Sequence, residues 1–329
     1  MEQTLRFFTN RDVRSMLQLD ECIDAVEKAF RCHVEGKSLG PGVLGIHAED
    51  GGFHIKAAGL DLGRRYFVVK TNGNFVNNRE KHGLPTIQGM LLLFDAANGT
   101  PLAVMDSIEI TIRRTGAATG VAARHLARAD ARVMTVCGCG NQGEVSLRAV
   151  AKVRNIERVY AWDIDPSRAA SFASGMSQEL GRSVTAVDDL VTATLDSDIV
   201  ATCTTASSPF LNRSMVKPGA FVAAVGADSD TKQELSSDLL AGSKVVVDNL
   251  AQCIEIGDLK LAINDKSMTA SDVHAELGEV ITGAFPGRES ADEVIVFDST
   301  GTALQDAAAS AIVYERGIES NYGTSIELS

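Results

Sequence analysis

Aromatic residues, positive charge and long apolar segments are all scarce in this sequence. Aromatic side chains make up 5% of the 329 residues, and 43 acidic residues against 31 basic ones give a formal net charge of −12. Nucleic acids and anionic membrane surfaces favour a basic face on their partners, so this charge balance argues against both. No apolar run approaches the roughly 20 residues that cross a bilayer, so we expect no membrane-spanning helix.

Cysteine is sparse as well and never forms a Cys-x-x-Cys pair, so we expect no metal site. Three of the cysteines lie in or beside apolar runs that are typical of buried strands. The first residues, Met1–Thr4, lack a signal-peptide pattern. These features favour reduced thiols in a cytoplasmic protein. The cysteines are Cys22, Cys32, Cys137, Cys139, Cys203 and Cys253.

The chain exceeds the size at which one hydrophobic core usually stops growing, so we expect two domains. Its first part opens with a helical pattern over about 30 residues and continues with short apolar runs separated by turn residues. Two of these runs flank a turn that ends in Asn98-Gly99, which is typical of a β-hairpin. The runs predict a mostly antiparallel sheet and cover residues 43–46, 53–58, 66–70, 87–95 and 101–106.

The second part of the chain has a different pattern of predicted elements. An Ala-rich segment at 115–128 predicts a helix, and short apolar strands then alternate with helical or loop segments. Such alternation is typical of an α/β fold with a parallel sheet covered on both faces. The last ~25 residues, from Gln305, are again helical and could return to the first domain. The predicted strands are 133–137, 159–162, 199–203, 221–225, 245–247 and 294–297.

The segment Gly138-Cys139-Gly140-Asn141-Gln142-Gly143 matches the pattern G-x-G-x-x-G. An apolar strand precedes it, a helical stretch follows it, and Asp163 lies 20 residues beyond Gly143, at the end of the next predicted strand. This context predicts a Rossmann site that binds a dinucleotide pyrophosphate at a helix N-terminus. Asp163 would accept hydrogen bonds from the adenosine ribose and repel a 2′-phosphate, which favours NAD over NADP. The alternative is a glycine turn without a ligand.

An ordered set of further segments resembles the ornithine cyclodeaminase/mu-crystallin family over nearly the whole chain. The resemblance implies a homodimer in which a Rossmann domain, here residues 115–304, is inserted into a discontinuous substrate-binding and dimerisation domain, residues 1–114 plus 305–329. It also implies hydride transfer between NAD and the α-carbon of an amino acid. Besides the glycine motif and Lys70, the segments are Gly83–Gly89, Leu93–Ala96, Ile110–Ala118, Gly226–Asp228 and Phe297–Gly301.

In this family, residues at the positions of Lys70 and Arg114 hold the substrate carboxylate. Charge-assisted hydrogen bonds from two cations suit this task because they orient a planar carboxylate. Lys70 ends an apolar run and Arg114 leads into the Ala-rich helix, although either residue taken alone is more often a solvated surface charge. Arg113 is the neighbouring rival for the role of Arg114.

Asp228 matches the catalytic aspartate of the family. It follows a predicted strand, which places it at the carboxyl edge of the parallel sheet, where ligands of such folds bind. As a carboxylate it would exchange a proton with the substrate nitrogen or activate a water molecule. The alternative is a helix cap, because Asp228, Ser229, Asp230 and Thr231 are good caps for a helix over 232–240.

Several other polar residues are candidate ligands. Lys56 shares a strand face with His54, where a third carboxylate ligand and a solvent-exposed pair are equally favoured interpretations. The resemblance places the remaining candidates at the cofactor, and we expect contacts from Thr115, Thr204, Thr205, Asp298, Ser299, Thr300 and Gly301.

The sequence around the predicted aspartate, Gly226–Glu234, resembles the alanine dehydrogenase-like branch more than the ornithine cyclodeaminases. We find no candidate site for the distal amine that cyclodeamination requires. We therefore favour an oxidoreductase acting on a small amino or imino acid. The alternatives are a redox-neutral cyclodeaminase and a non-catalytic, crystallin-like binder. Retention of Lys70, Arg114 and Asp228 together argues against the binder.

Overall fold

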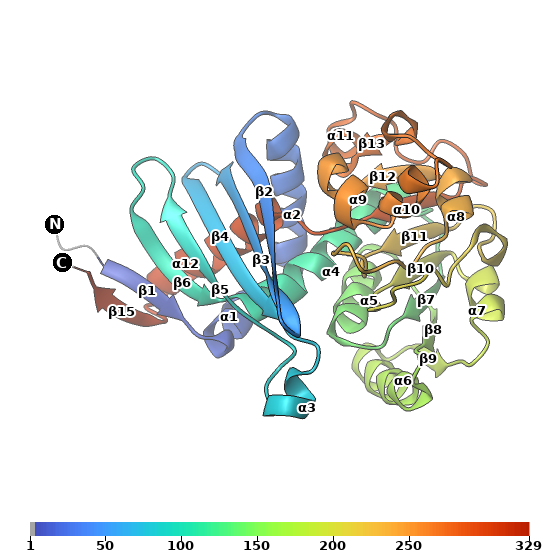
Figure 1. The fold of residues 1–329 in the computed structure, drawn as a ribbon, viewed down its shortest axis with the longest axis horizontal. Helices are drawn as coiled ribbons and strands as arrows, with labels where there is room; N and C mark the ends of the chain where they lie inside the picture. The colour runs from blue at the N-terminus through green and yellow to red at the C-terminus, as the bar shows by residue number, and fades with distance from the viewer. Residues whose placement is uncertain (1–3, 329) are drawn as a thin grey trace. The chain divides into compact units, whose positions relative to one another are not determined.

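The computed structural model describes residues 4–328 and divides the chain into two compact units (Figure 1). The first unit comprises Met1–Arg114 and Thr302–Ser329, and the second comprises Thr115–Gly301. The observed division therefore assigns residues 302–304 to the first unit, whereas the expected boundary lies after residue 304.

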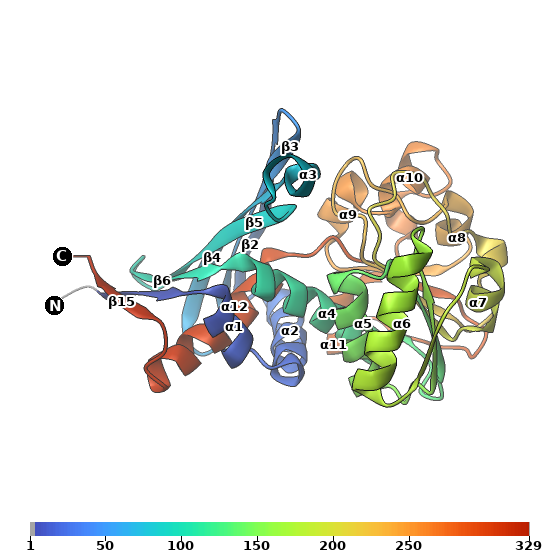
Figure 2. The same ribbon diagram turned by 90° about the horizontal axis from the view of Figure 1, so that it is seen from below.

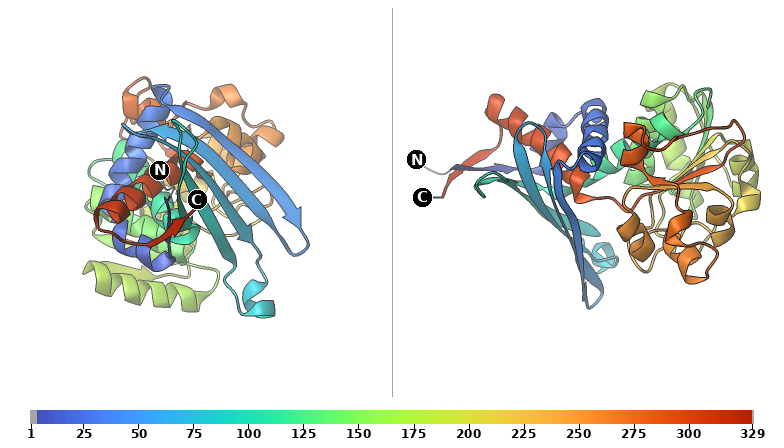
Figure 3. Two further views of the ribbon diagram at one scale, coloured as in Figure 1. Left: turned by 90° about the vertical axis from the view of Figure 1, so that its left-hand side faces the viewer. Right: turned by 90° about the horizontal axis from the view of Figure 1, so that it is seen from above.

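The first unit is built on a seven-stranded sheet in the order β15-β1-β6-β5-β4-β3-β2. All neighbouring strands are antiparallel except β1 and β6. Its helices α2 and α12 pack against each other and against strands β3 and β4 on one side of the sheet (Figures 2 and 3). The elements are β1 (Thr4–Phe8), α1 (Asn10–Met16), α2 (Leu19–Val34), β2 (Ser38–Ala48), β3 (Gly51–Asp61), β4 (Arg65–Asn74), α3 (Asn78–His82), β5 (Ile87–Asp95), β6 (Pro101–Asp106), α12 (Ala303–Glu319) and β15 (Thr324–Glu327), with α4 (Ser107–Leu126) crossing into the second unit.

The second unit contains an eight-stranded sheet in the order β13-β12-β14-β11-β10-β7-β8-β9, and every neighbouring pair is parallel. The predicted α/β Rossmann class is therefore confirmed. The elements are β7 (Val133–Cys137), α5 (Asn141–Val153), β8 (Arg158–Trp162), α6 (Pro166–Leu180), β9 (Ser183–Ala186), α7 (Leu190–Asp196), β10 (Ile199–Thr202), β11 (Phe221–Ala224), α8 (Ser237–Ala241), β12 (Lys244–Val247), α9 (Leu250–Ile256), α10 (Leu259–Asn264), β13 (Ala275–Glu276), α11 (Leu277–Thr282) and β14 (Ile295–Asp298), with short 3₁₀ turns at Arg213–Met215 and Ala270–Asp272.

The central strands of this parallel sheet consist almost wholly of apolar residues, and their polar exceptions, Thr202 and Asp298, lie at the carboxyl ends of β10 and β14. Every residue of β10, β11 and β14 is buried, as expected for strands covered on both faces. The strand order reverses between β7 and β10, which are neighbours in the sheet although β8 and β9 lie between them in sequence. Open α/β sheets bind ligands beyond the carboxyl ends of the strands at such a switch point.

Over residues 4–328, the structure has no helix that is long and apolar enough to cross a membrane. The single predicted helical pattern at the start of the chain proves to be two helices, α1 and α2, with a break at Leu17 and Gln18.

Candidate functional site

A cluster of buried cations lies inside the first unit. Lys70 on β4 and Lys56 on β3 are direct cross-strand partners, and their side chains are only 3% and 7% exposed. Arg114, in α4, is 5% exposed. Buried lysine and arginine side chains are rare unless they are paired, so the cluster requires an acidic partner.

That partner is Asp306 of α12, which is completely buried. The Lys70 ammonium lies 2.8 Å from its carboxylate, and Arg114 donates from Nε to Oδ1 at 3.0 Å. Arg114 also donates to the side-chain oxygen of Gln305 at 2.8 Å, and Lys70 donates to the Thr111 hydroxyl at 3.2 Å. Strand β4 and helices α4 and α12 therefore meet at one carboxylate.

Burial and the neighbouring charges together determine the protonation of this cluster. It lowers the pKa of Lys70 to about 7, although Asp306 acts in the opposite direction, and the nearby Arg114 and Lys56 lower it further. Burial alone would raise the pKa of Asp306, but Lys70 and Arg114 outweigh that effect and hold the pKa below its ordinary value. The aspartate is therefore ionised at neutral pH, while Lys70 is poised between its two forms.

The structure separates the alternatives that the sequence left open. Arg113 donates to Glu109 at 2.8 Å, one turn away on α4, so the contacts to Asp306 belong to Arg114. The interpretation of Lys56 as a solvent-exposed residue is wrong, because the even-numbered positions of β3 face inward around it. Phe53, on the opposite face of the same strand, is 42% exposed instead.

The glycine motif of the second unit forms the turn between β7 and α5. Gly138 has a φ of +97°, and a Cβ there would lie 2.7 Å from the carbonyl oxygen of Cys203. A Cβ on Gly143 would lie 2.2 Å from the Gly138 carbonyl oxygen, so only glycine permits this turn.

The same turn leaves room on its open side, as a dinucleotide site requires. A Cβ on Gly140 would meet no atom within 4 Å. Gly140 is the N-cap of α5, so no side chain at the cap accepts hydrogen bonds from the backbone N–H groups of the first turn. The buried Oε1 of Gln142 also has no hydrogen-bond partner among the described residues. Together with Asn141, these residues fit a pyrophosphate held at a helix N-terminus.

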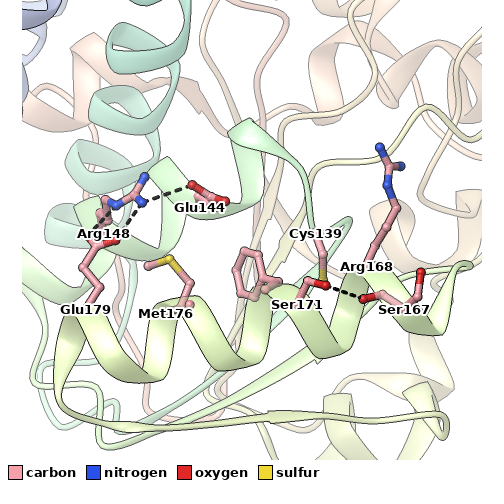
Figure 4. A pocket seen from close by; sticks show the side chains of 10 residues that line it. Cys139, Glu144, Arg148, Ser167, Arg168, Ser171, Met176 and Glu179 are labelled. Carbon is pink, nitrogen blue, oxygen red and sulfur yellow. Dashed lines mark hydrogen bonds and ion pairs between the residues drawn. The ribbon is translucent and has the colours of Figure 1, made fainter.

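Asp163 follows β8 and contacts the glycine turn directly. Its carboxylate accepts from the backbone N–H of Cys139 at 2.8 Å and from that of Asp165 at 3.0 Å. Cys139 also lines a groove of about 310 Å³ between α5 and α6, where Arg148 is neutralised by ion pairs with Glu144 and Glu179 (Figure 4). The carboxylate of Asp163 is thus held beside the glycine turn by two backbone donors, and its contact with the ribose stays a prediction.

Asp228 lies in the turn that follows β11, and its side chain is 51% exposed. Its Oδ1 accepts from the Lys232 ammonium at 2.6 Å. The predicted helix over 232–240 does not form there, because α8 begins only at Ser237 with Ser236 as its N-cap. The capping interpretation of residues 228–231 is therefore wrong, and an exposed carboxylate remains at the carboxyl end of a central strand.

Glu234 is a buried acid that fastens two loops at this end of the sheet. Its carboxylate accepts from the Thr202 hydroxyl at 2.6 Å, from both the backbone N–H and the hydroxyl of Thr204, and from the backbone N–H of Gly226 at 2.9 Å. Burial raises the pKa of Glu234, while these donors favour the ionised form. Asp258 in turn accepts from the backbone N–H of Glu234 at 2.7 Å.

The structure shows the surroundings of each predicted cofactor contact in the second unit. The Thr204 hydroxyl is engaged by Glu234, whereas Thr205 is exposed. The Asp298 carboxylate is completely buried and accepts from the backbone N–H of Leu259, so this side chain holds a loop, and its contact with the cofactor stays a prediction. Asp248 fixes the segment that follows Asp298, because it accepts hydrogen bonds from Ser299, Thr300 and Gly301. Thr115, 8% exposed, opens the second unit within α4.

Sequence reasoning missed Asp306, Glu234, Asp248 and Asp258. Asp306 had a visible signal, since it is the one acidic residue within the small and apolar stretch Ala303–Val313. Glu234 follows the predicted aspartate, but nothing local distinguishes it from a surface acid. The described residues contain no cluster of side chains suited to a metal ion.

Comparison with known proteins gives one consistent result. The model of the ornithine cyclodeaminase/mu-crystallin family matches residues 4–321. An archaeal alanine dehydrogenase dimer with bound NAD is 36% identical, with a TM-score of 0.95 over 99% of this chain and 100% of that one. The Δ1-pyrroline-2-carboxylate reductase of Thermococcus litoralis, solved with NADH and L-proline, is 33% identical, with a TM-score of 0.93 over 97% and 99% of the two chains. The iminosuccinate reductase of Paracoccus denitrificans, solved with NAD⁺, is 30% identical, with a TM-score of 0.91 over 99% and 100%.

Proposed function

Since the chain belongs to the ornithine cyclodeaminase/mu-crystallin family, we propose that it is an NAD-dependent oxidoreductase that transfers hydride between the nicotinamide and the α-carbon of a small amino or imino acid. The observation that carries the proposal is the buried cluster of Lys56, Lys70 and Arg114 around Asp306. Three cations around one carboxylate leave excess positive charge in a buried place, which suits an anionic group of a substrate.

Each group has a distinct chemical task. Lys70 and Arg114 would hold and orient the substrate carboxylate, and Lys56 would contribute further positive charge. Asp228 would exchange a proton with the substrate nitrogen, for which its exposure at the carboxyl end of β11 is suitable. Bound NADH would supply the hydride.

The second unit supplies the cofactor site of this proposal. The turn at 138–143 would hold the pyrophosphate, and Asp163 would accept from the adenosine ribose and disfavour a 2′-phosphate. The segment 298–301, in which Ser299, Thr300 and Gly301 donate to Asp248, would line the nicotinamide side of the cofactor site.

We also propose that the working form is a homodimer, assembled through the face of the first sheet opposite α12. Leu44 and Ile46 of β2 are 55% and 48% exposed, and Phe53 of β3, the cross-strand partner of Ile46, is 42% exposed. Met90 and Leu92 of β5 are 40% exposed on the same face. A second copy would cover this apolar surface, as large exposed patches usually mark interfaces.

The function is tested by following NADH absorbance with the purified protein. One direction uses L-alanine, L-proline and L-aspartate with NAD⁺, and the other uses Δ1-pyrroline-2-carboxylate, or 2-oxo acids with ammonia, with NADH. We expect net oxidation of NADH with at least one imino acid. The decarboxylated analogue Δ1-pyrroline should not react, because it has no carboxylate for Lys70 and Arg114 to bind.

Two results would contradict the proposal. Ammonia released from L-ornithine or L-lysine with catalytic NAD and no net change in NADH would indicate a cyclodeaminase. Binding of NADH without turnover of any of these acids would indicate a non-catalytic binder.

A further inference from the structure

We propose that Asp306 is a positioning residue of the carboxylate-binding cluster, holding Lys70 and Arg114 in place and favouring the charged form of Lys70 before a substrate carboxylate arrives. This inference rests on the proposed function of the cluster. No step of the reaction needs a second carboxylate at this place, so the burial of Asp306 requires its own explanation.

The first argument is geometric. Asp306 accepts from two cations that come from different elements, Lys70 at 2.8 Å from β4 and Arg114 at 3.0 Å from α4. Gln305, its neighbour on α12, accepts from the same guanidinium at 2.8 Å. One turn of α12 therefore fixes both cations, and a site must be held within a fraction of an ångström to orient a substrate.

The second argument is electrostatic. The groups that face Lys70 are Lys56 from β3, Arg114 from α4 and Asp306 from α12, and the thiol of Cys22 from α2 faces the same cluster. Burial raises the pKa of Cys22 to about 12, so this thiol is neutral and contributes no charge. Leu91, opposite Lys70 on β5, is apolar. Among these groups, Asp306 is the one that favours the protonated form of Lys70.

The sign of the pH dependence follows from these contacts. With Asp306 present, the pKa of Lys70 is about 7, so the charged form is lost as the pH rises through that value. Removing the carboxylate leaves burial and two neighbouring cations, all of which lower the pKa. Lys70 in Asp306→Asn should therefore be neutral already at pH 7 and regain its proton only at lower pH.

The test compares Asp306→Asn with wild type in reduction of Δ1-pyrroline-2-carboxylate by NADH across pH 5.5–8.5. We expect KM at pH 7 to rise by about tenfold or more while kcat changes less, which indicates loss of binding energy common to substrate and transition state. The decline of kcat/KM with pH should begin about one pH unit lower or more, because kcat/KM reports groups of the free enzyme. The matched control is Glu109→Gln, which removes the other buried carboxylate described in the first unit but leaves the cluster intact.

An unchanged pH profile in a folded Asp306→Asn variant would overturn the inference, even if KM rose, since a purely structural role shifts no pKa. If that variant does not fold, Asp306→Glu carries the test. The displaced carboxylate should raise KM severalfold, and an unchanged KM would contradict the positioning role.

Wild-type protein that turns over none of the offered acids would refute the proposed function instead. In that case, calorimetric titration of L-proline into the NADH-loaded protein at pH 6 and pH 8 still tests the role of Asp306. Weaker binding of L-proline to Asp306→Asn than to wild type supports the role, and equal binding contradicts it.

Discussion

Lys70, Lys56 and Phe53 show how single residues in one sheet invert the usual rule of apolar inside and polar outside. The two lysines are buried while Phe53 is 42% exposed, although a strand normally buries its apolar face. Burying two lysines without function would cost stability, since desolvation of a charge is expensive. The inversion agrees with the two proposals made above, a ligand site on the buried face and a protein interface on the exposed face.

Asp228 is the residue that the proposed mechanism requires for proton transfer to and from the substrate nitrogen. Asp228→Asn keeps the size and the turn but removes the proton acceptor, so kcat should fall by roughly 10²–10⁴-fold. The affinity for NADH, measured by fluorescence titration, should stay near the wild-type value.

Asp230→Asn provides the matched control, because it removes a second exposed carboxylate from the same turn. Its turnover should stay near wild type. If both variants lose activity equally, the loop rather than the Asp228 carboxylate is responsible. Full activity of Asp228→Asn would remove Asp228 from the mechanism.

At the scale of whole elements, the loops after β10 and β11 are joined by one buried side chain. Glu234 accepts hydrogen bonds from Thr204 in the first loop and from Gly226 in the second, two residues before Asp228. A Cβ on Gly226 would lie 2.4 Å from this carboxylate, so the close approach needs glycine. Glu234 thus links the order of the Asp228 loop to the stability of the second unit.

Glu234→Gln should destabilise the second unit. All four contacts to the carboxylate come from donors, so the amide NH₂ of glutamine would face at least one donor and leave it unsatisfied. An unsatisfied buried donor costs about 1–3 kcal/mol, and we expect a loss of that size in the free energy of unfolding. Urea denaturation followed by fluorescence of Trp162, the single tryptophan, reports this unit.

The matched control is Glu179→Gln, which removes a half-exposed carboxylate paired with Arg148 on the same unit. Its effect should stay within about 1 kcal/mol, as for other surface ion pairs. A Glu234→Gln variant as stable as this control would show that Glu234 does not fasten the loops.

The sequence predicted those elements whose pattern is local. The buried parallel strands are mostly apolar runs, and the local sequence also marks the start of α6, because Asp165 caps this helix and Pro166 is its first residue. Strands β1 and β15 were not predicted, since their pairing joins Leu5 to Ile326 across almost the whole chain. Asp306 carries a local signal as the one acid within Ala303–Val313, but its partners Lys70 and Arg114 come from distant segments and could not be predicted.

At the scale of the whole molecule, the proposed dimer follows from the apolar face of the first sheet. Specific interfaces bury on the order of 800 Å² per partner, and exposed Leu44, Ile46, Phe53, Met90 and Leu92 form the apolar centre that such an interface requires.

Ile46 and Phe53 are directly paired across β2 and β3, so the double substitution Ile46→Glu/Phe53→Glu places two carboxylates in the centre of this face. Burying them against a second copy would cost several kcal/mol, whereas water solvates them freely in a monomer. Light scattering coupled to gel filtration should give twice the chain mass of 34.9 kDa for wild type and the single mass for the double variant.

The matched control is Val191→Glu/Leu195→Glu on α7 of the second unit, where the two residues are 45% and 43% exposed. This control should remain dimeric. A monomeric wild type would refute the dimer, and a dimeric Ile46→Glu/Phe53→Glu variant would place the interface on another face.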